Sequence, residues 1–177
     1  MNRIGAITLS ILLILVLTCP ALAQEAENDF KEQFTNHFSY ANRVVQLAKA
    51  IPAEDYSWRP AEGVMSIEEV FAHIAQSNYY YLTGTLGLES PEGLDLQNMG
   101  EVTGKDEVLK LMEESIDFVN ASVADLPEEV LTDSYQLYGR SVTGQAVLFQ
   151  LVTHLSEHVG QSIAYARMNG VTPPWSQ

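Results

Sequence analysis

Residues 142–170 read VTGQAVLFQLVTHLSEHVGQSIAYARMNG, and this stretch decides the fold. Its apolar residues recur at spacings of three and four, the pattern of a helix with one buried face. Gly170 suits the position just after a helix, and Pro173 and Pro174 prevent the helix from continuing. We therefore predict a long helix that begins near Thr143 and ends at Gly170.

Three other stretches show the same periodicity. The first spans about 28–51 and is followed by Pro52. The second starts at Ser66, which forms an S-x-x-E capping box with Glu69, and extends to about residue 82. The third spans about 105–123. Each has an apolar face that must be buried against another element.

Four amphipathic helices in one small domain predict an all-α fold, a four-helix bundle. The connection over residues 84–102 is long enough to cross the end of a bundle, so the second and third helices run parallel, in up-down-down-up order. Residues 127–142 contain a short turn of helix. The only segment with β-strand propensity is VLTDSYQLYGRSV at 130–142, and it is too short for us to predict a strand.

Three histidines carry the functional prediction. His154 and His158 are four residues apart in the last helix, so their side chains point the same way, one turn apart. His73 lies in the second helix and supplies a third imidazole if the two helices are neighbours. Three protein ligands leave positions open on a metal ion, which is typical of a reactive site rather than a structural one. Three imidazole ligands do not determine whether the metal is Zn, Ni, Fe, Cu or Mn.

Each histidine also has a simpler interpretation, as a core residue with a satisfied hydrogen bond. In a chain of this length with four histidines, two of them fall four residues apart by chance about 7% of the time, so the spacing alone does not establish a metal site. His37, near the apolar stripe of the first helix, is either a fourth ligand or partly buried packing, and packing is favoured.

The acidic and aromatic neighbours leave alternatives open. Glu69 orients His73, acts as a general base near the metal, or simply completes the capping box, and the cap is favoured. His154-Leu-Ser-Glu157-His158 matches the H-x-x-E-H pattern of some peptidases, but no acidic ligand follows His158. Tyr80, seven residues after His73, either lines a substrate pocket or packs at the edge of the core.

The N-terminal sequence MNRIGAITLSILLILVLTCPALAQ predicts a secretory signal peptide at residues 1–23. Arg3 supplies the positive charge that is typical of the start of a signal peptide, and Ala21-Leu22-Ala23 forms the cleavage site. Cys19 offers a lipoprotein alternative, which Thr18 before it disfavours. Cleavage would leave residues 24–177 as one exported, periplasmic or secreted domain that has no cysteine.

The chain carries 9 Lys and Arg against 23 Asp and Glu, a net charge of −14. Nucleic-acid binding requires a basic face that displaces counterions, and the sequence has no Lys/Arg cluster. We therefore expect no nucleic-acid partner, and no membrane association after signal cleavage.

Three segments resemble the DinB / YfiT-like metalloenzyme family. SWRPAEGVMSIEEVFAHIAQ at 57–76 is similar to its tryptophan-proline loop and serine-capped helix with one metal histidine. HLSEHVGQSIAYARMNGVTPPWS at 154–176 resembles its closing H-x-x-x-H-x-G-Q segment and proline-rich tail. FTNHFSYANRVV at 34–45 resembles its first helix.

The resemblance implies that His73, His154 and His158 bind one divalent metal in a four-helix bundle, often a homodimer. Relatives include thiol transferases and isomerases that use a low-molecular-weight thiol. Export would separate this chain from cytoplasmic thiols, and Met65 replaces an aromatic residue that is usual before the capping serine.

We therefore expect an exported metal-dependent enzyme, a transferase or hydrolase acting on a small molecule through Lewis-acid activation. The alternatives are a non-catalytic periplasmic metal-binding protein and a helical interaction bundle with an unused pocket.

Overall fold

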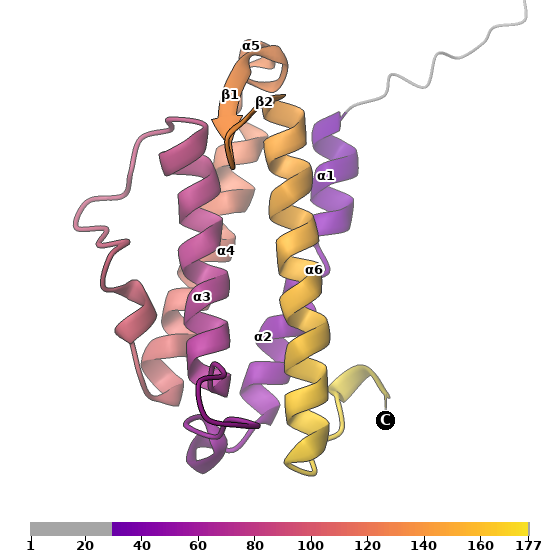
Figure 1. The fold of residues 1–177 in the computed structure, drawn as a ribbon. Coiled ribbons are helices and arrows are strands. Elements are labelled where there is room, and N and C mark those ends of the chain that lie inside the picture. Colours follow the sequence, from indigo (N-terminus) through magenta and orange to yellow (C-terminus); the bar gives the residue numbers. More distant parts are fainter. Residues whose placement is uncertain (1–29, 177) are drawn as a thin grey trace, which may run out of the picture.

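The computed structural model describes residues 30–176, which form a four-helix bundle with a small hairpin at one end (Figure 1). The four arms of the bundle are α1 with α2, then α3, α4 and α6. The first and last arms run in one direction, and α3 and α4 run parallel to each other in the opposite direction, as predicted. The helices and strands are α1 (Phe30–Phe38), α2 (Ala41–Ala50), α3 (Ile67–Tyr79), α4 (Lys105–Ala124), α5 (Glu128–Thr132), β1 (Ser134–Leu137), β2 (Arg140–Thr143) and α6 (Gly144–Met168).

The first arm is broken, whereas the sequence predicted one helix over 28–51. Ser39 and Tyr40 separate α1 from α2, and bonds of the i→i+3 type tighten the chain there, from Asn42 N to Ser39 O at 3.2 Å and from Arg43 N to Tyr40 O at 3.0 Å. Ala41, Val44 and Ala48 of α2 are buried in the core, while Val45 is only partly buried.

The capping box at the start of α3 is confirmed. The backbone N–H of Ser66 donates to Glu69 Oε2 at 2.6 Å, and the backbone N–H of Glu69 donates to Ser66 Oγ at 3.3 Å. After Tyr79 the helix continues as a π-helical turn over Tyr80–Thr85. Such turns are rare and occur frequently at functional sites.

Residues 86–104 run along the side of the bundle, from the end of α3 back to the start of α4 at the opposite end, and so allow α3 and α4 to run parallel (Figure 1). This crossover segment is held against α3 by the Gln76 amide, which donates to Leu96 O at 2.6 Å. At the other end, the backbone N–H of Gly104 donates to Glu68 Oε2 at 2.9 Å. The crossover therefore forms a wall beside α3.

A β-hairpin occupies residues 134–143, where the sequence analysis predicted no strand. β1 and β2 pair antiparallel, with Leu137 opposite Arg140, so only Tyr138 and Gly139 form the turn. Both have positive φ, 51° and 75°, which matches the two-residue turns that suit the strand twist. The prediction missed the hairpin because tyrosine rarely adopts positive φ. The expected short turn of helix is α5.

The last helix, α6, agrees with the prediction. Thr143 caps it by accepting from Ala146 N at 3.3 Å, and Gly170 follows it with a φ of 76°. Its inward face, which contains Val147, Leu151 and Ser162, is buried. No helix among residues 30–176 is long and apolar enough to cross a membrane. The expected signal peptide and Cys19 lie outside the described residues.

Candidate metal centre

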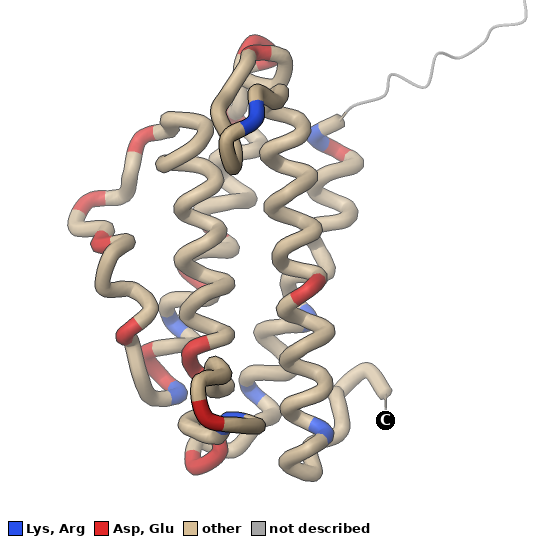
Figure 2. Tube along the Cα trace, in the orientation of Figure 1, with Lys and Arg blue, Asp and Glu red and all other residues tan. Residues whose placement is uncertain are grey.

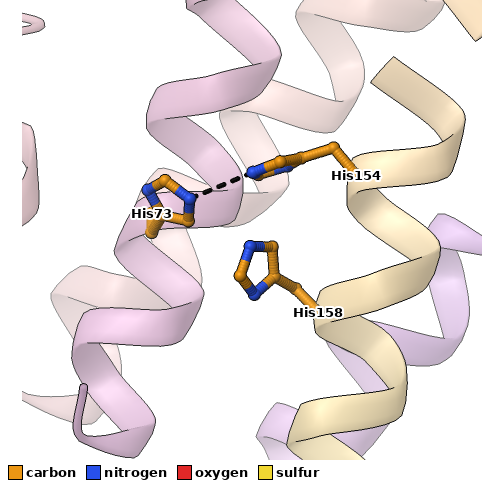
Figure 3. Close-up of side chains that lie close together, drawn as sticks. All are labelled: His73, His154 and His158. Atoms are coloured by element: carbon orange, nitrogen blue, oxygen red, sulfur yellow. Dashed lines mark hydrogen bonds between the residues drawn. The ribbon is translucent and has the colours of Figure 1, made fainter. Parts of the chain in front are cut away.

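The imidazoles of His73, His154 and His158 converge between α3 and α6 (Figure 3). One ligand nitrogen from each residue lies within 4.8 Å of the other two. His73 Nε2 and His154 Nε2 are 3.0 Å apart, and the ring of His158 lies 4.8 Å from that of His73 and 4.5 Å from that of His154. The predicted convergence of two distant segments is therefore present.

Helical packing positions these rings. Leu151 and Leu155 bury the inner face of α6, and His154 and His158 lie at its edge, facing α3. His73 lies between buried residues of α3 and meets them from the other side. All three residues are partly buried, so the bundle holds them in place while part of their surface stays accessible to solvent.

Burial favours the uncharged form of His73 and His154. Burial, followed by the proximity of His158 and His73, lowers the pKa of His154 to about 4. Burial and then His158 also lower the pKa of His73 below its ordinary value. A metal ligand must present an unprotonated nitrogen, and these environments favour that form.

A hydrogen-bond chain fixes the ring of His158. Its Nδ1 lies 2.8 Å from Gln161 Oε1, so Nδ1–H donates to the amide oxygen and Nε2 keeps its lone pair for the centre of the cluster. Gln161 in turn donates from Nε2 to Tyr165 Oη at 2.9 Å. Trp58 packs edge-on against Tyr165, with 5.5 Å between ring centroids. The loop before α3 thereby supports the cluster.

The donor set fits a divalent transition metal. Zinc–nitrogen bonds of about 2.0–2.1 Å at tetrahedral angles separate two ligand nitrogens by roughly 3.3 Å. The observed nitrogen positions, from 3.0 Å to within 4.8 Å of one another, require only small side-chain shifts. Three imidazole nitrogens suit zinc, nickel, iron and copper, and would leave positions on the ion open.

A cavity of about 430 Å³ adjoins the cluster and includes His73 and His154 in its wall. Ser77, one turn after His73, places its Oγ 3.4 Å from His154 Nε2. Tyr80 and Tyr81 both line this cavity, which agrees with the pocket alternative for Tyr80. A molecule in the cavity would therefore lie beside His73 and His154, two of the residues that would hold the ion.

The other candidate residues lie elsewhere. His37 is exposed and lies outside the histidine cluster, and it is also less buried than the packing alternative implied. Glu69 contacts Ser66 and Arg59, whose hydrogen bonds lower its pKa, so it serves the helix cap. Glu157 is exposed, as expected for a solvated residue.

Sequence reasoning missed three residues of the site: Ser77, Tyr138 and Gln161. Ser77 and Gln161 follow a histidine by four and three residues, so helical spacing was a usable signal for both. Tyr138 had no local signal, because only the hairpin brings it to the cavity.

The comparisons with known proteins agree with this geometry. The sequence model of the DinB family matches residues 24–177. The chain belongs to the DinB family. YjoA, an uncharacterised protein of Bacillus subtilis (strain 168), is 33% identical over 144 residues, which cover 79% of this chain and 91% of YjoA.

Solved structures share the fold of this DinB-family chain. A DinB-like protein from Bacillus cereus ATCC 10987 superimposes with a TM-score of 0.69 at 21% identity, covering 81% of this chain and 95% of that protein. YfiT from Bacillus subtilis, described as a probable metal-dependent hydrolase with an unusual four-helix bundle topology, gives 0.62 at 15% identity, covering 80% and 89%. The family resemblance and the bundle prediction are confirmed.

Proposed function

We propose that this DinB-family protein is a metal-dependent enzyme that hydrolyses a small molecule or transfers a group from it. The observation that carries the proposal is the convergence of three imidazoles, two of which, His73 and His154, line the wall of a cavity. The description of YfiT as a probable metal-dependent hydrolase supports the hydrolytic version. A bound divalent metal would supply Lewis-acid chemistry, polarising a carbonyl group or lowering the pKa of water.

The residues of this chain then have separate roles. His73, His154 and His158 hold the ion, and Gln161 orients His158. Ser77 offers a hydroxyl next to the cluster, where it can hydrogen-bond a bound molecule. The cavity holds the molecule against the histidines.

A second candidate is a non-catalytic metal-binding protein. Among the described residues, no Asp or Glu joins the histidine cluster, so no carboxylate is placed to act there as a general base. Metal retention without turnover of any ester, amide or thiol-transfer substrate would favour this candidate.

Metal content tests the site. Elemental analysis of the purified protein should find about one equivalent of a divalent transition metal, and His73→Ala and His158→Ala should each lose most of it. His37→Ala is the matched control, because His37 is an exposed histidine outside the cluster. Equal metal content in all four proteins would refute the site.

Turnover tests the enzyme. The metal-loaded protein should cleave a member of a panel of chromogenic esters and amides, or transfer a small thiol, and His158→Ala should abolish this activity. Activity that persists in His158→Ala would assign the chemistry to another site.

We also propose that the protein is exported after cleavage at residue 23 and acts as a homodimer. The N-terminal sequence supports export, and family resemblance supports the dimer. The intact mass of the secreted or periplasmic protein should equal that of a chain that begins at Gln24. Analytical ultracentrifugation should give twice the mass of residues 24–177. A diacylglycerol adduct at Cys19 would instead support the lipoprotein alternative.

A further inference from the structure

Helix α6 has an exposed face but carries almost no charge. Of its 25 residues, only Glu157 and Arg167 are charged at neutral pH, and Figure 2 shows the helix almost free of acidic and basic positions. The exposed side of a helix in a single domain normally carries charged residues. Helix α4 follows that rule over its 20 residues, with Lys105, Asp106, Glu107, Lys110, Glu113, Glu114 and Asp117. The outer side of α6 is therefore unusual for a surface that meets only water.

The charge-poor side of α6 points away from the bundle. Leu151 is buried in the core, whereas Thr153, Ser156, Ala164 and Met168 are exposed, the last at 66%. At about 100° per residue, these four fall on the side of the helix opposite Leu151. We call this surface the α6 face. It consists of small and apolar side chains, which suit contact with another helix.

The two charges of α6 lie on this face as well. Glu157 and Arg167 are exposed, and neither has an ionic partner within residues 30–176. They are ten residues apart, which is about 15 Å along the helix and too far for them to pair within one copy.

These charges are placed symmetrically about the level of Ser162, five residues from each. When a second copy of α6 packs antiparallel about a two-fold axis at that level, Glu157 of each copy comes level with Arg167 of the other. The α6 face is therefore complementary in charge to itself.

The charge of the whole chain also favours a second copy as the occupant of this face. Two copies that each carry a net charge of −14 repel one another, so they can associate only where acidic residues are few. A basic partner would instead be attracted to the acidic residues of α4. A membrane surface would require several basic residues around the apolar ones, and the α6 face has only Arg167.

We propose that the α6 face is the interface of a symmetric homodimer in which two α6 helices pack antiparallel. This inference rests on the homodimer proposed above and assigns its contact surface. In a two-fold dimer the same patch serves both copies. Small side chains such as Ser156 and Ala164 allow the two helix axes to approach to about 8–10 Å. His154 and His158 point towards α3, so the dimer leaves the histidine cluster accessible (Figure 3).

A charge placed in the α6 face tests the interface. Sedimentation equilibrium over a range of protein concentrations measures the dissociation constant of the dimer. Ala164→Glu places an additional carboxylate against the other copy and should weaken the dimer about ten-fold or more. Ala121→Glu is the matched control, because it makes the same change at an exposed alanine of α4. Equal dissociation constants for the parent protein and both variants would overturn the proposal.

Charge reversal tests the antiparallel register. Glu157→Arg brings like charges together at both ends of the contact and should weaken the dimer about three- to thirty-fold. The double variant Glu157→Arg/Arg167→Glu exchanges the two charges and should restore the dissociation constant of the parent protein. A double variant that is as weak as Glu157→Arg would overturn the proposed packing. Circular dichroism and thermal melting confirm that the variants are folded.

The outcomes separate this interface from the function on which it rests. A parent protein that is monomeric at every concentration would refute the homodimer and the interface together. A dimeric parent protein whose Ala164→Glu variant is equally dimeric would refute the interface alone. Metal content tests the histidine site independently of both, since Ala164 lies outside the cluster.

Discussion

His158 Nδ1 lies 2.8 Å from Gln161 Oε1, and this contact decides which nitrogen of His158 faces the cluster. A glutamine oxygen can only accept a hydrogen bond, so the proton must be on Nδ1. Gln161 is itself fixed by its donation to Tyr165. Such partners of metal-binding histidines set ring orientation and raise ligand basicity.

Replacing Gln161 by leucine should weaken metal affinity about 10- to 100-fold, because His158 loses the group that orients it. Gln161→Glu keeps an acceptor for Nδ1–H and should retain most of the affinity. Competition with a metal-binding chromophore measures both constants. Similar affinity in the parent protein and in Gln161→Leu would show that packing alone orients His158.

The metal-free protein should lose stability on acidification. Burial lowers the pKa of His154 from 6.5 to about 4, so between these values the unfolded chain binds more protons than the folded chain. The free energy of unfolding therefore falls as the pH decreases through this window. His73, whose pKa is also lowered, adds to the effect.

His154→Gln isolates this contribution, because an amide does not titrate. Chemical denaturation at a series of pH values, in the presence of a chelator, should show a smaller loss for His154→Gln than for the parent protein. The exposed His37→Gln should follow the parent. Parallel curves for all three proteins would contradict the burial of His154.

Gly144→Ala should destabilise the protein by about 1–3 kcal/mol. A Cβ atom there would clash with Val130 O and lie 3.2 Å from Leu131 Cα, and both are backbone atoms that can move only with α5. Thermal melting measures the loss. Gly160→Ala is the control in the same helix. It meets nothing within 4 Å and should be stabilising by about 0.5–1 kcal/mol, so similar melting of both variants would argue against the clash.

The bundle could be predicted because its helices carry local signals. The Ser66–Glu69 box and Gly170 mark helix ends, and apolar periodicity marks the faces. The break after α1 had no such signal, since Ser39 and Tyr40 are neither glycine nor proline.

The histidine cluster could be predicted for the same reason, since i,i+4 spacing fixes two rings and helix pairing brings the third. The hairpin could not. Its turn places a positive φ on Tyr138, which is unusual for a tyrosine, so the sequence contains no typical turn signal there. Neither the two strands nor the position of the Tyr138 phenol beside Tyr81 could therefore be predicted.

His73 and His154 are 81 residues apart in the chain, and an ion held between them would join α3 to α6. Only the folded chain presents that ligand set, so the ion would raise the melting temperature by mass action, adding about 2.7 kcal/mol at a free concentration 100 times its dissociation constant. The resistance of this protein to proteolysis would then depend on the local concentration of the metal. Metal depletion would both empty the site and increase the degradation of the protein.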